Sequence, residues 1–229
     1  MIRSAKKIFA ALLFAFSLFA TTAQAGPPLI CHAFDIANAK SLPWISHDWN
    51  LTGSESYSSN DLATDTIAIL DADPRVLVHM ETLRRATLYA RANPLAAKQL
   101  LLKLIARVDS SVNSPAAALA SFDLGYLAET YKQWLGNDQS NPAQGLDGYA
   151  LVKKAIQLHP NDPQMEFAAA LISLNRPSSD QPQHAQKAIA GAKNDPLLAR
   201  NLSTHFRGPQ TELMSDMISA NSYVKVARQ

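Results

Sequence analysis

The chain lacks most of the motifs from which catalytic and cofactor sites are built. Its 229 residues include a single cysteine, Cys31, so neither an internal disulfide nor a Cys-x-x-Cys-His haem attachment can form. Only eight glycines occur. No phosphate-binding glycine loop, Gly-x-Ser-x-Gly or His-Glu-x-x-His motif is present. These absences favour a binding protein over an enzyme, and we expect no cofactor and no metal.

Strand patterns are nearly missing as well. No run of alternating Val, Ile, Thr and aromatic residues lies between turn signals. Apolar residues instead recur at helical spacing from about residue 60 onward, and Asn-Pro or Asp-Pro pairs mark several helix starts. The sequence therefore predicts an all-α protein.

The N-terminal segment, residues 1–25, has the pattern of a signal peptide. Arg3, Lys6 and Lys7 precede an apolar run from Ile8 to Ala20, and a small-x-small cleavage site ends at Ala25. The apolar run is short for a membrane span, and no later segment approaches one. We therefore expect cleavage between Ala25 and Gly26 and export to the periplasm or the medium, with no transmembrane segment in the mature chain.

Removal of the leader makes the chain nearly neutral. Three of its 21 basic residues lie in the leader, which leaves 18 basic against 19 acidic residues. A nucleic-acid-binding domain is expected to be strongly basic, so no nucleic-acid partner is predicted.

The mature chain divides into an arm, residues 26–59, and a helical domain, residues 60–229. The arm contains prolines and serines but is too apolar for a disordered tail, which predicts an extended segment lying on the helices. In the helical domain we predict helices over residues 61–71, 74–92, 94–108, 116–135, 147–158, 165–174 and 183–192, a further helix from 196 and a capping helix over 211–220.

Two stretches of the helical domain repeat each other. Residues 153–156 (KKAI) precede Asn161-Asp162-Pro163, and residues 186–189 (QKAI) precede Asn194-Asp195-Pro196. The displacement is the same for both pairs, from position 153 to 186 and from 161 to 194. A period of about 33 residues is typical of stacked helical hairpins, in which each hairpin buries its apolar face against its neighbours.

The region from about residue 115 to 196 resembles the tetratricopeptide-repeat family. Gly148, Ala155 and Pro160 match the small residues and the closing proline of its second helix, and Leu124-Gly125 resembles the contact point of its first helix. The spacing from Gly125 to Pro160 is longer than the family spacing, and the excess falls in the polar loop 137–146. The resemblance implies a short, irregular α-solenoid that binds a protein or peptide partner.

The resemblance also implies where such a partner would bind. In that family the concave surface is lined by the first helices of the hairpins. By position, the predicted partner-binding residues are Arg84, Arg85, Tyr89, Tyr126, Glu129, Lys132 and Gln133. We therefore expect a protein- or peptide-binding scaffold or adaptor.

The charge pattern between Arg75 and Arg107 is uneven, with seven basic residues against Glu81 alone. Adjacent Arg84 and Arg85 could bind a carboxylate or phosphate. A solvated helix face is the favoured interpretation, with Glu81 forming a weak surface pair to these arginines.

An alternative function rests on the arm. Cys31, His32 and His47, with Asp35 and Asp48, form the only compact set of metal-capable side chains, which would suit an envelope enzyme or a metal-dependent accessory protein. Their spacing fits no zinc pattern. A third alternative is self-association, since an exposed Cys31 thiol would allow a disulfide between two chains.

Overall fold

The computed structural model describes residues 27–45, 51–136, 140–174, 176 and 180–206. The regular elements in these residues are one 3-10 helix and eight α-helices, which confirms the all-α prediction. The bounds are η2 Ser59–Asp61, α2 Leu62–Ala72, α3 Val76–Ala90, α4 Pro94–Ser110, α5 Ala117–Trp134, α6 Gly148–Leu158, α7 Pro163–Ser173, α8 Asp180–Ala192 and α9 Pro196–His205. None of the described helices is long and apolar enough to cross a membrane.

A capping side chain and a proline mark the starts of three helices. Asn93, Asp162 and Asp195 each accept hydrogen bonds from backbone N–H groups of the first turn that follows. A proline occupies the first turn in all three helices, where its missing N–H leaves no donor unpaired. Both signals act over a few neighbouring positions, so the sequence alone displays them.

Three predicted helix starts were wrong. Helix α7 begins at Pro163, ahead of the predicted start at Met165. Helix α3 begins at Val76 rather than Pro74, because Arg75 is extended and Asp73 accepts a hydrogen bond from the Arg75 N–H. Helix α8 begins at Asp180, ahead of the predicted start at Gln183, with Pro182 in its first turn. The predicted helix at 211–220 lies outside the described residues.

The sequence repeat corresponds to equivalent positions in the structure. Ala155 on α6 and Ala188 on α8 are both fully buried. Asp162 and Asp195 cap α7 and α9. The Gln164 side chain lies between neighbouring helix starts, since it accepts from the Leu77 N–H of α3 and donates to Asp195 of α9.

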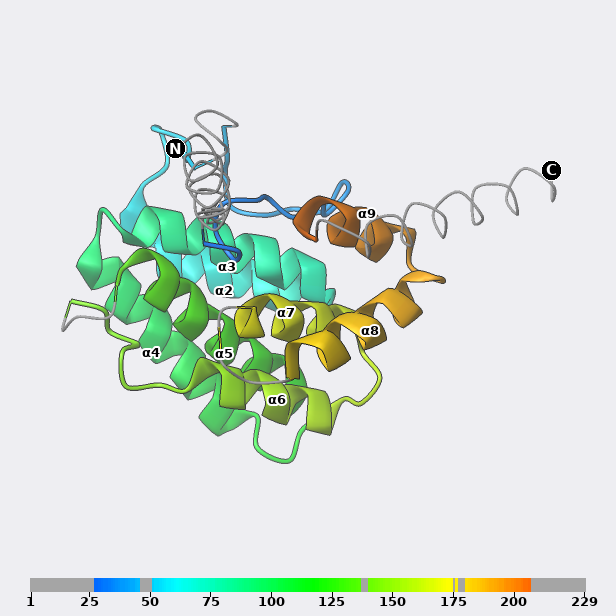
Figure 1. The fold of residues 1–229 in the computed structure, drawn as a ribbon. Coiled ribbons are helices and arrows are strands. Elements are labelled where there is room, and N and C mark those ends of the chain that lie inside the picture. Colours follow the sequence, from blue (N-terminus) through cyan, green and yellow to red (C-terminus); the bar gives the residue numbers. More distant parts are fainter. Residues whose placement is uncertain (1–26, 46–50, 137–139, 175, 177–179, 207–229) are drawn as a thin grey trace, which may run out of the picture.

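Alternate helices contact one another. Helices α3, α5 and α7 contact each other, whereas α6 pairs with α5 and α8 pairs with α7 as helical hairpins. The predicted first hairpin of α3 with α4 was wrong in detail: α4 packs mainly on α2 and α5 and only lightly on α3. Figure 1 shows the arm passing over α3 toward α9.

Helices α5 and α6 approach each other closely at two glycines. A Cβ atom on Gly125 of α5 would lie 2.6 Å from the Gly148 carbonyl oxygen of α6, and one on Gly148 would meet the Gly125 carbonyl oxygen in the same way. Leu124-Gly125 was predicted to allow close backbone contact, and the geometry confirms that approach.

The polar loop after α5 folds back on the domain. Asn141 is buried, donates to the Gly136 carbonyl and accepts from the Ala143 N–H. The Ala143 side chain is fully buried. The described part of the loop, residues 140–146, therefore belongs to the packed body.

We predict that Gly125→Ala destabilises the protein. Overpacking costs about 1–3 kcal/mol, and the upper end applies because the contacted atom is a backbone oxygen that cannot rotate away. The gain in helix propensity is about 1 kcal/mol. The net loss of unfolding free energy in urea should therefore be about 2 kcal/mol. Gly145 is the matched control, since a Cβ there meets nothing within 4 Å. Equal stability of the Gly125→Ala and Gly145→Ala variants would contradict the close contact.

Candidate functional site

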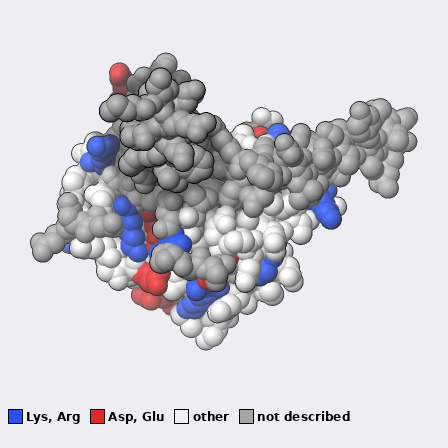
Figure 2. Space-filling model, in the orientation of Figure 1, with Lys and Arg blue, Asp and Glu red and all other residues white. Residues whose placement is uncertain are grey.

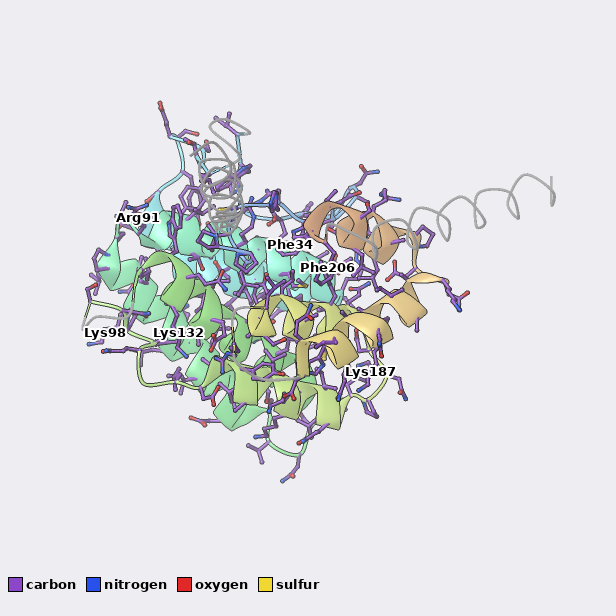
Figure 3. The ribbon with its side chains drawn as sticks, viewed as in Figure 1. Phe34, Arg91, Lys98, Lys132, Lys187 and Phe206 are labelled. Carbon is purple, nitrogen blue, oxygen red and sulfur yellow. The ribbon has the colours of Figure 1, made fainter. Side chains whose placement is uncertain are left out.

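The predicted partner-binding residues separate into three groups. Arg84, Arg85 and Tyr89 on α3, with Gln133 on α5, lie beneath the arm and hydrogen-bond to its main chain. Tyr126 is fully buried in the core. The remaining two, Glu129 and Lys132, pair with each other at 2.9 Å, and Lys132 also donates to the Leu146 carbonyl beside α6. In Figure 3, Lys132 lies apart from Phe34 of the arm. The structure thus brings four of the seven together, and the arm covers them.

The arm is held by its main chain as well as by its side chains. Its apolar residues Leu29, Ile30, Phe34 and Leu42 are almost completely buried. The backbone at these residues meets polar side chains of the helices rather than a strand. The surface on α3, α5, α7 and α9 that contacts residues 29–44 is called the arm site below.

A buried ionic cluster forms the centre of the arm site. Glu81 accepts from Arg84 at 2.8 and 3.1 Å, from Arg85 at 2.7 Å and from the Phe34 N–H at 3.0 Å. Glu81 and Arg84 have no exposed surface. The prediction of a weak, solvated helix-surface pair was therefore wrong, because the arm excludes water from it.

Both arginines also bind the arm. Arg84 donates to the Ile30 carbonyl at 2.9 Å and Arg85 to the Leu42 carbonyl at 2.7 Å. The Trp44 ring lies over both guanidinium groups, at 5.1 and 5.7 Å from its centroid. Such cation–π contacts gain strength when water is excluded.

A second anchor lies on α9. The Asn201 amide accepts from the Asp35 N–H at 2.8 Å and donates to the Asp35 carbonyl at 2.9 Å, so it binds both main-chain groups of one residue. Arg200 donates to the Asp35 carboxylate at 2.7 Å. This hydrogen bond lowers the pKa of Asp35. The clamp fixes the point at which the arm reaches α9.

An aromatic pocket receives the residue before this clamp. The Phe34 ring stacks on His205, with centroids 4.5 Å apart, and lies nearly perpendicular to the Phe167 ring, with centroids 6.0 Å apart. Phe206 also packs against Phe167. Figure 3 shows Phe34 and Phe206 close together near α9.

The arm then turns and comes back over α3. Ala37 has a left-handed φ of 52°, and its N–H donates to the Asp35 carboxylate. Ser41 bonds to Thr82, and the Tyr89 hydroxyl donates to the Pro43 carbonyl and accepts from the Ser54 N–H. The arm therefore crosses α3 twice.

His205 is a neutral group within the aromatic pocket. Burial lowers its pKa to about 4, although the hydrogen bond between its Nδ1 and the Asn201 carbonyl acts in the opposite direction. Among charged groups, His32 lowers this pKa and Glu81 raises it. Protonation of His205 would place a cation against the Phe34 face in a poorly solvated position.

Sequence reasoning missed Glu81, Thr82, Arg200 and Asn201 as parts of the site. Asp35 and Asn201 are 166 residues apart, so no local motif could connect them. The only available signal was the Asp195-Pro196 helix start, which predicted α9 but not its contact with the arm.

The described metal-capable residues of the arm, Cys31, His32 and Asp35, do not form a metal site with one another. Cys31 is a half-buried free thiol whose pKa is raised by burial, and His32 meets the edge of His205. His47 and Asp48 lie outside the described residues. Over the ranges that the structure describes, no group of three His, Cys, Asp or Glu residues could hold a metal ion.

Two of the basic residues between Arg75 and Arg107, besides Arg84 and Arg85, form ion pairs. Arg75 pairs with Asp73, and Arg107 pairs with Asp71 and Asp123. Arg91 lies over the Trp134 ring. Figure 2 shows basic and acidic side chains interspersed on the visible face. The exposed Arg75–Asp73 pair agrees with the solvated-face interpretation, whereas Arg107 also pairs with the fully buried Asp123 and does not fit it.

A second buried polar cluster joins α6, α7 and α8. His184 bonds through Nδ1 to the Glu166 carboxylate and through Nε2 to the Tyr149 hydroxyl at 2.9 Å. Burial and the hydrogen bond to Asp180 raise the pKa of Tyr149 to about 12. The phenol therefore remains protonated near neutral pH and is poorly suited to act as a nucleophile.

Comparison of the chain with protein-family models, curated proteins and solved structures finds no match.

We predict that Glu81→Ala strongly destabilises the protein. Removal of one partner from a buried ion pair costs about 3–5 kcal/mol, because Arg84 would remain buried without its counter-charge. Urea unfolding measures the loss. Arg75→Ala, which breaks an exposed pair, is the control and should cost less than about 1 kcal/mol. Similar losses in the two variants would contradict a buried Glu81.

We also predict a pH dependence that His205→Phe removes. The folded pKa lies below the unfolded value of 6.5, so the stability contributed by the neutral ring is complete above pH 6.5 and is lost as the pH falls toward 4. The loss of unfolding free energy over this window should be on the order of 2 kcal/mol larger for the wild type than for His205→Phe. Parallel pH profiles would show that His205 does not titrate in this way.

Proposed function

We propose that this protein is an exported helical scaffold that binds an extended segment of a protein partner at the arm site. In this proposal the helices form a short solenoid similar to tetratricopeptide repeats, and the leader ending at Ala25 directs export. The contact of α3, α5 and α7 with one another supports such a stack.

The observation that carries the proposal is the manner in which the arm is bound. Side chains of the helices contact its main chain at Leu29, Ile30, Phe34, Asp35 and Leu42. Main-chain recognition is available to any extended segment, and pockets for alternate side chains add specificity. The arm site therefore has the chemistry of a peptide-binding surface, and the chain's own arm occupies it.

A partner segment must compete with this arm. A tethered segment has an effective concentration in the millimolar range, so a free partner with the same contacts binds weakly until the arm is loosened. A substitution that loosens the arm should therefore increase partner capture. A substitution in the helices that form the arm site should abolish it.

A capture experiment in the native host tests this function. Tagged full chains are compared as wild type, Phe34→Ala, and Phe34→Ala combined with Asn201→Ala, each checked for helical content by circular dichroism. We expect an exported partner that Phe34→Ala captures at least several-fold more strongly and that the double variant loses. Identical partner lists for the three chains, or capture of no exported protein, would contradict the proposal.

A further inference from the structure

We propose that the α9 end of the arm site recognises an aromatic residue followed directly by an acidic residue in an extended segment, and that a partner carrying this pair displaces the arm. This inference rests on the proposed function and specifies the chemistry of the partner. In the structure, Phe34 and Asp35 of the arm stand in for the partner's pair.

The aromatic position is defined by shape and burial. The Phe34 side chain is 3% exposed, stacks on the His205 ring and lies nearly perpendicular to the Phe167 ring. Its N–H donates to Glu81, which fixes how far the ring enters the pocket. An aliphatic side chain would lose the stacked contact with His205, so the pocket favours an aromatic ring.

The acidic position comes directly after the aromatic position, because Asn201 holds the backbone of that residue. Asn201 is 1% exposed and binds both the N–H and the carbonyl of Asp35. With the Asp35 main chain held in this way, the Asp35 side chain points to Arg200, whose Nε lies 2.7 Å from the carboxylate. The order aromatic then acidic is therefore set by geometry, and the reverse order would place a carboxylate in the aromatic pocket.

The arm supplies hydrogen-bond partners to the scaffold at this position. Without a bound segment, the Asn201 amide and the Glu81 carboxylate would exchange these hydrogen bonds for bonds to water. A competing segment must supply the same main-chain groups. The Asp35–Arg200 pair is about half exposed on both sides, so this end of the arm is where a competitor gains access.

A peptide-binding measurement tests the pair. The probe is a fluorescein-labelled peptide of residues 29–40 carrying Cys31→Ser, and the receptor is the purified full chain with Phe34→Ala in its own arm. A second receptor carries Asp35→Arg instead, which loosens the arm by charge repulsion without leaving a cavity. We expect saturable changes in anisotropy with both receptors and at least tenfold weaker binding to the wild-type chain, whose arm competes.

Matched peptides isolate the recognition of the pair. Replacement of Phe34 by Ala in the peptide, or exchange of the two residues to Asp-Phe, should weaken binding to the Phe34→Ala receptor at least tenfold. An added Asn201→Ala in this receptor should weaken binding of the unchanged peptide by about tenfold. A receptor with Arg200→Glu should prefer a peptide with Asp35→Lys over the unchanged peptide by about two- to fivefold, because the exposed ion pair is restored with reversed charges.

Three results would overturn the inference. Equal binding of the Phe-Asp and Asp-Phe peptides would remove the order preference, while the wider proposal of an extended-segment site would stand. No binding to either loosened receptor would reject the site itself. A doubled mass of the wild-type chain in light scattering, reversed by the free peptide, would assign the site to the arm of a second copy. If the peptides behave as expected but the native host yields no partner, the proposed function fails and the pair recognition stands.

Discussion

The buried Glu81 carboxylate is the interaction on which the arm and the helices both depend. It accepts four hydrogen bonds, three from Arg84 and Arg85 on its own helix and one from the Phe34 N–H of the arm. A carboxylate and a guanidinium without exposed surface are tolerable only when fully paired. Helix α3 supplies most of that pairing, and the arm supplies the rest together with the cover that excludes water.

This arrangement makes the arm an integral part of the folded protein. Its apolar side chains complete the core over α3 and α9, and its main-chain groups satisfy buried side chains of the helices. A segment bound in this way resembles a ligand in its contacts but remains attached to the chain. The bound arm shows that the site can hold an extended segment. It also competes with any partner, because it already occupies the site in the free protein.

Local signals account for the success of the sequence in locating helices. The starts of α4, α7 and α9 depend on a capping side chain and a proline at neighbouring positions. The buried Ala155 and Ala188 likewise follow from a repeat that is visible in the sequence. The start of α3 was misplaced because Asp73 bonds to the Arg75 backbone, an alternative that the same residues allow equally well.

The sequence by itself determined the helical class, most helix boundaries and the lack of a recognisable catalytic motif, since each depends on residues close together in the chain. Only the tertiary structure decided which helix face is covered and which charges are buried. Arg84 and Glu81 have the spacing of an ordinary surface pair, and their burial results from an arm that lies far from α3 in the sequence. The contact of Asp35 with Asn201 spans most of the chain, and such long-range pairings leave no trace in local sequence patterns.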